Sequence, residues 1–88
     1  MIKRSLVIRN KYGLHARPSA KFVEIASKYQ AQVIISKDGL KVNGKSIMGV
    51  LMLAAEKGNK IEISANGKDE EAAIEALAGL LEGKLDEE

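Results

Sequence analysis

The stretch Gln32-Val33-Ile34-Ile35-Ser36-Lys37-Asp38-Gly39-Leu40-Lys41-Val42-Asn43 decides the fold of this chain. Its first half is rich in β-branched residues, which favours a strand over Gln32–Lys37. Asp38-Gly39 is a strong signal for a two-residue hairpin turn, so the chain should return as a second strand over Leu40–Asn43. The centre of the sequence therefore predicts two antiparallel strands.

On the N-terminal side of this hairpin, the pattern predicts one helix and one strand. Apolar residues at helical spacing predict a helix over Ala16–Tyr29. Pro18 suits its first turn, where the missing N–H costs nothing. The residues before it predict a strand over Ser5–Ile8, flanked by Ile2.

On the C-terminal side, the pattern predicts two helices separated by a strand. Ser46 is expected to be the N-cap of a short helix over Ile47–Ala55, which Gly58 would end. The alternation of Lys60–Ala65 predicts a strand. Asp69 is expected to cap a last helix with an acidic first turn, whose C-terminal end is followed by an acidic tail.

The predicted element order is βαββαβα in one domain spanning residues 1–88. The simplest packing for this order is an α+β fold of the open-faced β-sandwich type. In it, a four-stranded, mostly antiparallel sheet is covered on one face by three helices.

The composition narrows the classes of function. The chain has 88 residues, one histidine and no cysteine, which favours a reducing compartment and argues against a metal site or a disulfide framework. A chain this short leaves little room for a bound cofactor, so we expect none. Neither a signal peptide nor a membrane span is predicted, so we expect a cytoplasmic protein that does not insert into membranes.

Charge is distributed unevenly along the chain, although the net charge is only +2. The first quarter is basic, with Lys3, Arg4, Arg9, Lys11, Arg17 and Lys21, and the last is acidic, with Asp69, Glu70, Glu71, Glu75, Glu82, Asp86, Glu87 and Glu88. A basic face suits an acidic protein partner or a nucleic acid. Aromatic stacking residues are scarce, so we predict that the chain does not bind nucleic acid.

Residues 39–46 match the phosphate-loop pattern G-x-x-x-x-G-K-[ST]. That mechanism needs a loop between a buried strand and a long helix, so that successive amides wrap the phosphates. Here Leu40-Lys41-Val42 alternates like a strand and completes the hairpin. We therefore predict that this segment does not bind nucleoside triphosphates.

The run Gly13-Leu14-His15-Ala16-Arg17-Pro18 contains the single histidine. A lone histidine is most often a surface residue or a satisfied core residue. Here, however, Gly13 can adopt an unusual backbone angle. His15 falls at or just before the first helical turn, where the amides of Ala16 and Arg17 are free. Arg17 also adds a guanidinium group suited to phosphate.

We expect the positive end of the helix dipole to favour a neutral, nucleophilic imidazole. The same field would stabilise the negative charge of a phosphohistidine without a metal ion. Hydrolysis is a poorer alternative, because no Ser–His pair or carboxylate stands at catalytic spacing. Covalent phosphoryl transfer is therefore the leading hypothesis.

This hexapeptide, together with Lys45-Ser46-Ile47-Met48-Gly49-Val50 about thirty residues later, resembles the HPr family, the histidine phosphocarriers of the bacterial sugar phosphotransferase system. The resemblance covers essentially the whole chain, and the element order agrees. It implies a phosphoryl carrier rather than an enzyme. His15 would accept the phosphoryl group at Nδ1 from phosphorylated enzyme I and pass it to a histidine of an enzyme IIA domain.

By the same resemblance, Arg17 would orient the phosphate and the backbone amide of Ala16 would bind it. Ser46 would be a regulatory site for HPr kinase/phosphorylase, although an N-cap role alone would explain a serine there. A phosphoserine at a helix N-terminus is well tolerated and would reduce encounter with an acidic phosphodonor. A catabolite-control transcription factor is a further candidate partner, and we expect a monomer.

The helix after Ser46 presents more apolar surface than it can bury beneath itself. We predict an adaptable docking surface for partners. Its members are Leu14, Ala20, Lys21, Ile47, Met48 and Leu51; the simpler alternative is that Val50, Leu51 and Leu53 of this helix are core residues. The alternative functions are a regulatory interaction module governed by Ser46 and, more remotely, a small RNA-binding domain.

Overall fold

A computed structural model describes residues 1–9 and 11–82. Along the chain it contains β1 (Ile2–Val7), α1 (Ala16–Ala26), β2 (Gln32–Lys37), β3 (Leu40–Asn43), α2 (Ile47–Met52), β4 (Lys60–Asn66) and α3 (Glu70–Glu82). The predicted order βαββαβα is confirmed. The end of the acidic tail, with Asp86, Glu87 and Glu88, lies outside the described residues.

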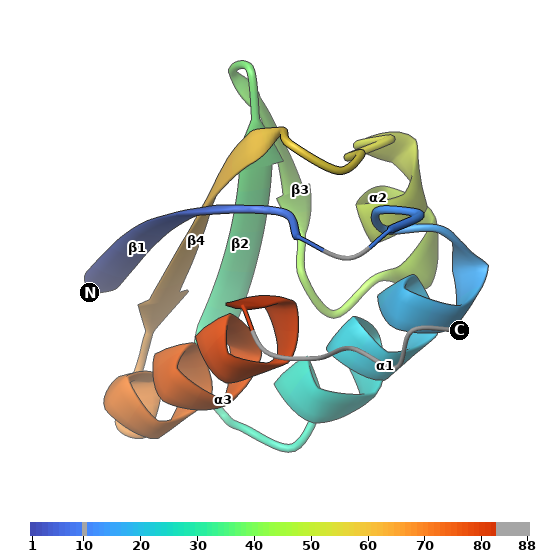
Figure 1. The fold of residues 1–88 in the computed structure, drawn as a ribbon. Coiled ribbons are helices and arrows are strands. Elements are labelled where there is room, and N and C mark those ends of the chain that lie inside the picture. Colours follow the sequence, from blue (N-terminus) through green and yellow to red (C-terminus); the bar gives the residue numbers. More distant parts are fainter. Residues whose placement is uncertain (10, 83–88) are drawn as a thin grey trace.

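The four strands form one sheet in the order β1-β4-β2-β3, and every neighbouring pair is antiparallel. Figure 1 shows the three helices together on one side of this sheet. The predicted α+β open-faced sandwich is therefore confirmed. The first and last strands of the sequence pattern, β1 and β4, lie side by side, with Leu6 opposite Ile61.

One core fills the space between the sheet and the helices. Alternate residues of the strands point into it because successive side chains of a strand lie on opposite faces. The strands contribute Leu6, Val33, Ile35, Ile61, Ile63 and Ala65, and the helices contribute Phe22, Ala26, Val50, Ala73, Ile74, Leu77, Ala78 and Leu81. The sheet face opposite the helices carries mostly polar residues, as the period of two requires.

The central hairpin forms as predicted. Asp38 and Gly39 both have positive φ, 52° and 86°, which is the backbone of the tight turn that Asp-Gly favours. Leu40–Asn43 pairs with β2 along its length. Residues 40–43 of the phosphate-loop match are thus a sheet strand, and their backbone bonds belong to the ladder instead of wrapping a phosphate.

Helix α1 ends earlier than predicted, at Ala26 instead of Tyr29. The amides of Lys28 and Tyr29 bond to the carbonyl groups three residues back, of Ile25 and Ala26, so the chain tightens into turns. Apolar spacing continued to Tyr29 because that side chain still packs against the core. Strand β1 also differs in its bounds, starting at Ile2 and ending at Val7.

Helix α2 ends at Met52 instead of Ala55, and Gly58 does not end it. Ala54 takes the left-handed conformation (φ 51°) that usually falls to glycine after a helix. The amide of Gly58 bonds instead to the carbonyl group of Ile8, 2.9 Å away, and so prolongs the contact between the β1 and β4 ends.

Asp69 directly precedes α3, as predicted, but its carboxylate serves another part of the chain. Its two oxygens accept hydrogen bonds from the amides of Gln30 (2.9 Å) and Ala31 (2.8 Å). The carboxylate therefore ties the start of α3 to the connection between α1 and β2. The bond from Gln30 is the main cause that lowers the pKa of Asp69.

None of the helices formed by the described residues has the length and apolar character needed to cross a bilayer.

Candidate functional site

His15 is the N-cap residue of α1, where the sequence placed it. Its backbone is extended (φ −84°, ψ −168°), as is usual for the residue that begins a helix. The side chain is half-buried and makes no capping hydrogen bond to its own helix. The imidazole is therefore partly accessible at the N-terminus of α1, and it does not cap this helix through a hydrogen bond.

The backbone that leads into His15 is anchored on two sides. Gly13 has a φ of 68°, and a Cβ built there would meet the Ala55 carbonyl oxygen and approach Glu56 Cα to 2.7 Å. The amide of Leu14 donates to the Ala55 carbonyl oxygen (2.9 Å). Only glycine fits this close approach, so the turn before His15 is held against the segment that follows α2.

Ser19 supplies the second anchor. Its fully buried hydroxyl donates a hydrogen bond to the carbonyl oxygen of Leu14 (2.9 Å). Sequence analysis missed this residue, because a serine inside a helix carries no signal of its burial. The bond fixes the peptide immediately before His15, which is the part of the chain that aims the imidazole.

The first turn of α1 leaves two amides exposed to a ligand. The amide of Ser19 bonds to the carbonyl oxygen of His15 (2.9 Å), which is the first bond of the helix. Pro18 has no N–H. Within residues 1–9 and 11–82, the amides of Ala16 and Arg17 have no acceptor. These two donors, with the positive end of the helix dipole, form a place for an anion beside the imidazole.

Arg17 is exposed on the first turn, two residues from His15. In the described part of the chain, its guanidinium makes no ion pair or hydrogen bond; the two ion pairs found there join the Met1 amine to Glu70 and Arg4 to Glu75. A guanidinium without a partner can swing toward a phosphate and bind it with two parallel hydrogen bonds. The geometry is compatible with the role predicted for Arg17.

Tyr12 lies against the imidazole, although sequence analysis did not single it out. The two ring centroids are 5.6 Å apart and the ring planes are nearly perpendicular, at 86°. The Lys11 ammonium nitrogen lies 5.3 Å from the centroid of the Tyr12 ring. A sequence signal existed, because a tyrosine three residues before the only histidine can reach it across a tight turn.

Ser46 is the N-cap residue of α2, as predicted. Its backbone is extended (φ −112°, ψ 118°), and its hydroxyl oxygen accepts a hydrogen bond from the amide of Gly49 (3.1 Å). This is the usual bond between an N-cap side chain and the third residue of the helix. The capping role is confirmed, and the regulatory role stays a prediction.

The predicted docking surface is only partly exposed. Ile47 and Met48 at the start of α2 are 38% and 63% exposed, and Met52 one turn later is 65% exposed. On the adjoining helix α1, Ala20 and Lys21 are exposed. Met48 and Met52 stand four residues apart and so share one face of α2. Met52 is therefore a further candidate for this surface, although the predicted set left it out.

Two other members of that set turn inward. Leu14 is 3% exposed and belongs to the hydrophobic core, so it offers almost no surface to a partner. The anchored turn at Gly13 directs its side chain between the helices and the sheet. Leu51 is half-buried. We therefore restrict the candidate docking surface, called the docking surface below, to Ala20, Lys21, Ile47, Met48 and Met52, with Leu51 at its edge.

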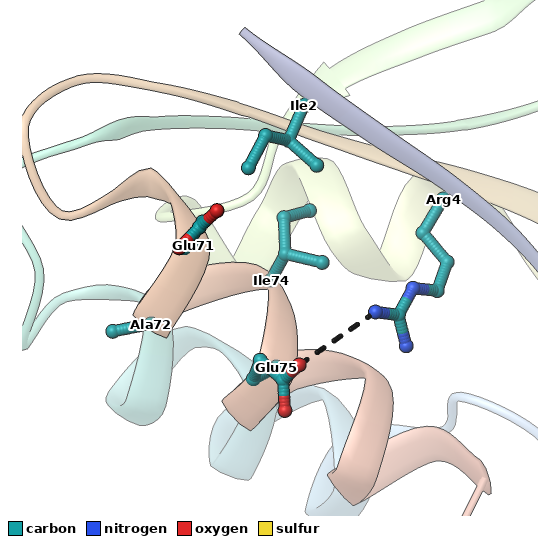
Figure 2. A pocket seen from close by; sticks show the side chains of 6 residues that line it. All are labelled: Ile2, Arg4, Glu71, Ala72, Ile74 and Glu75. Carbon is teal, nitrogen blue, oxygen red and sulfur yellow. Dashed lines mark ion pairs between the residues drawn. The ribbon is translucent and has the colours of Figure 1, made fainter.

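A pocket of about 570 Å³ lies elsewhere, between β1 and α3. Figure 2 shows its lining, in which the Arg4 guanidinium points at the Glu75 carboxylate, 4.0 Å away. It contains none of the residues predicted to act in phosphoryl transfer. Over the residues that the structure describes, no group of three His, Cys, Asp or Glu residues is placed to hold a metal ion.

Comparison with known proteins identifies the family. A family model described as "PTS HPr component phosphorylation site" matches residues 2–83. The phosphocarrier protein HPr of Neisseria meningitidis serogroup A is 49% identical over 87 residues, which cover 99% of this chain and 98% of that protein.

Solved structures agree. HPr-C-His from Thermoanaerobacter tengcongensis matches with a TM-score of 0.95 at 51% identity, covering 100% of this chain and 99% of that one. The Bacillus subtilis catabolite repression protein Crh, described as a dimer with a swapped domain, matches with a TM-score of 0.75 at 43% identity, covering 93% and 94%. The match of sequence, fold and element order confirms the resemblance that the two motifs carried. The chain belongs to the HPr family of phosphocarrier proteins of the phosphotransferase system.

Proposed function

We propose that His15 carries a phosphoryl group between phosphorylated enzyme I and enzyme IIA domains. The observation that supports this most is the partly accessible imidazole at the N-terminus of α1, beside two amides for which the described residues provide no acceptor. The Nδ1 atom attacks the phosphorus, a new P–N bond forms, and the bond between phosphorus and the donor breaks. The negative charge of the transferred group then lies close to the amides of Ala16 and Arg17 and to the Arg17 guanidinium.

Such a site suits a relay because it holds the phosphoryl group without hydrolysing it. A hydrolase needs a general base that activates water. Of the described carboxylates, none forms an ion pair or hydrogen bond with His15. The same amides and guanidinium would lie beside the phosphoryl group in both steps, since Nδ1 is the attacking atom in the first step and the leaving atom in the second. Reversible transfer between two proteins is the chemistry that this arrangement supports.

The test is phosphorylation with purified enzyme I and labelled phosphoenolpyruvate. We expect one acid-labile phosphoryl group for each chain, and transfer of that label when an enzyme IIA domain is added. His15→Gln is the matched control and should take no label. A wild-type protein that remains unlabelled, or that carries an acid-stable label in this assay, contradicts the proposal.

Ser46 is proposed as a regulatory phosphorylation site of HPr kinase/phosphorylase. Its hydroxyl already lies within hydrogen-bond distance of a helical amide, so phosphate oxygens at the same place would keep that donor paired. The added charge of about −1.5 to −2 would change the surface next to Ile47 and Met48 without unfolding α2. This change should weaken encounter with an acidic phosphodonor.

Ser46→Asp tests this effect, with Ser46→Ala as the control that removes the hydroxyl without adding charge. We expect Ser46→Asp to accept phosphate from enzyme I more slowly and Ser46→Ala to accept it at close to the wild-type rate. If Ser46→Asp reacts at the wild-type rate, the electrostatic explanation is wrong.

The docking surface is proposed to receive enzyme I and enzyme IIA domains. Methionine side chains are flexible and polarisable, so they can adapt to several partners. Met48→Glu should therefore raise KM for both transfer steps. Leu40→Glu is a matched control, because Leu40 is an exposed apolar residue (47%) at the hairpin, outside the docking surface. Equal behaviour of the two variants would exclude this surface.

A regulatory interaction module is the second candidate, and the likeness to Crh of Bacillus subtilis favours it. In that case a catabolite-control transcription factor would be the partner, and phosphate would appear on Ser46 only with the kinase and ATP. An acid-stable label under those conditions, with no label from enzyme I, would decide for the module.

The swapped dimer of that relative also bears on the oligomeric state. We propose a monomer, because one chain alone provides a complete core and pairs all four strands. Sedimentation equilibrium over a range of concentrations would reveal a dimer.

A further inference from the structure

We propose that Tyr12 is a positioning residue that fixes the orientation of the His15 imidazole for phosphoryl transfer. The inference rests on the proposed carrier function and deepens it. It is based on the contact between the Tyr12 and His15 rings.

The His15 ring has few restraints other than this contact. It makes no capping hydrogen bond, and in the described part of the chain it takes part in no ion pair. Backbone anchoring by Leu14 and Ser19 fixes where the side chain starts but does not by itself set the two side-chain torsions that orient the ring. A transferring imidazole must present one nitrogen in line with phosphorus, so this freedom has a cost in rate.

The perpendicular contact with Tyr12 restricts that rotation. A centroid distance of 5.6 Å and an angle of 86° lie within the range in which the positive edge of one aromatic ring attracts the negative face of another. Only a limited set of imidazole orientations keeps this arrangement. The contact with Tyr12 therefore holds the ring without using either ring nitrogen, and neither nitrogen has a hydrogen bond to residues 1–9 or 11–82.

Tyr12 does not belong to the hydrophobic core. The residue is 58% exposed. Its own position is supported by Gly13, which is pressed against Ala55, and by the Lys11 ammonium group over its ring. Cation–π contact of this kind is favourable even at an exposed site. Lys11 thus steadies Tyr12, and Tyr12 steadies His15.

An edge-to-face aromatic pair changes an equilibrium by about two- to tenfold. We therefore expect Tyr12→Leu, which keeps apolar bulk but removes the ring, to lower kcat for phosphoryl transfer from enzyme I about two- to tenfold. KM should stay unchanged, because the variant alters ring orientation and not docking. Tyr12→Phe retains the ring and should restore the wild-type kcat.

Nuclear magnetic resonance of the free protein gives a second readout that needs no partner. In the wild type and in Tyr12→Phe, the His15 ring protons should show nuclear Overhauser contacts and a ring-current shift from residue 12. The ring-current shift and the contacts with aromatic protons of residue 12 should disappear in Tyr12→Leu. Because Tyr12 is exposed, the thermal midpoint of this variant should stay within a few degrees of the wild type, which separates positioning from folding.

The outcomes are distinct. Unchanged ring-proton shifts and unchanged kcat in Tyr12→Leu overturn the proposal. A raised KM with unchanged kcat makes Tyr12 a docking residue and also overturns it, as does a Tyr12→Phe variant that behaves like Tyr12→Leu. A wild-type protein that takes no phosphate from enzyme I contradicts the carrier function, and the ring-proton shifts then still report whether the contact exists.

Discussion

Helices α1 and α2 both begin at a residue with an extended backbone, His15 for α1 and Ser46 for α2. The Ser46 hydroxyl closes its own helix through the amide of Gly49, the third helical residue. The corresponding third residue of α1 is Pro18, which has no amide hydrogen to offer. The imidazole of His15 makes no capping hydrogen bond, although the amide of Arg17, the second helical residue, has no acceptor among the described residues.

The comparison shows how one structural position can be used for stability in one helix and for chemistry in another. Proline at the third position removes one of the two donors that an N-cap side chain can bind, and it leaves the amides of Ala16 and Arg17 without an acceptor among the described residues. The start of α1 is thus stable without a cap and still able to receive an anion. Four predictions, two of them with a second variant for comparison, test this contrast from the largest expected effect to the smallest.

Gly13→Ala should break the start of α1 most severely. The new Cβ would collide with the backbone of Ala55 and Glu56, and the residue would remain at a φ of 68°. Left-handed strain and overpacking together should cost about 2 kcal/mol or more in the free energy of unfolding. Urea unfolding measures this loss.

Gly39→Ala separates the two causes. Gly39 also has positive φ (86°), but a Cβ there would meet nothing within 4 Å. The Gly39→Ala variant should therefore lose only the part of the free energy of unfolding that comes from backbone strain, about 1 kcal/mol. Equal losses for the two variants would mean that contact with the segment after α2 does not hold the turn.

Ser46→Ala should cost about 1 kcal/mol, because the amide of Gly49 loses its acceptor. Chemical denaturation of the variant and the wild type gives the difference directly. Ser46→Asp keeps an acceptor oxygen at the helix start and should stay near the wild-type stability. A neutral Ser46→Ala would show that the cap contributes nothing and would remove the contrast with His15.

His15→Asn should raise the free energy of unfolding by less than about 1 kcal/mol, since asparagine can accept a hydrogen bond from the open amide of Arg17. The same variant should carry no phosphate. Thermal unfolding checks the gain. If the variant is clearly less stable than the wild type, the histidine supports the fold, and this expectation is wrong.

At the start of α3, the carboxylate of Asp69 binds the amides of Gln30 and Ala31. We expect replacement of Asp69 to change the free energy of unfolding least, because solvent reaches this side chain. Backbone amide bonds, that from Gln30 first, hold its pKa below the ordinary value of 3.8. Its contribution to stability is therefore complete above the pKa of the unfolded chain and is lost as the pH falls through the folded value.

Asp69→Asn should reduce stability at pH 7, and the difference from the wild type should shrink as the pH falls below about 4. Urea midpoints measured from pH 7 down to pH 3 test this convergence. A constant difference over that range would mean that the charge of Asp69 plays no part in joining α3 to the α1–β2 connection.

Much of the fold could be predicted from local signals. The Asp38-Gly39 turn, the cap at Ser46 and the position of His15 are each written in a few neighbouring residues, so they needed no knowledge of distant contacts. The end of α2 could not be predicted in this way. Gly58 was predicted to end this helix, but its amide donates a hydrogen bond to the Ile8 carbonyl oxygen. Ala54 instead takes the left-handed backbone conformation after the helix.

The candidate site likewise has features that local sequence predicts and features that depend on tertiary packing. A lone histidine, a following arginine and a proline sufficed to predict an imidazole at a helix start. Three other features depend on how the turn packs against the rest of the molecule: the burial of Leu14, the hydrogen bond of the Ser19 hydroxyl and the orientation of Tyr12. No spacing rule distinguishes a leucine that a turn buries from one that it exposes.

By itself, the sequence determined the order of the elements, the antiparallel hairpin and the placing of the only histidine where two helical amides are open, because these depend on backbone preferences over a few residues. Tertiary structure alone decided that the turn at Gly13 rests on Ala55, that Asp69 binds the amides of Gln30 and Ala31, and which apolar side chains remain at the surface. Those contacts join segments about forty residues apart. They are selected by close packing of the whole core, which no local pattern records.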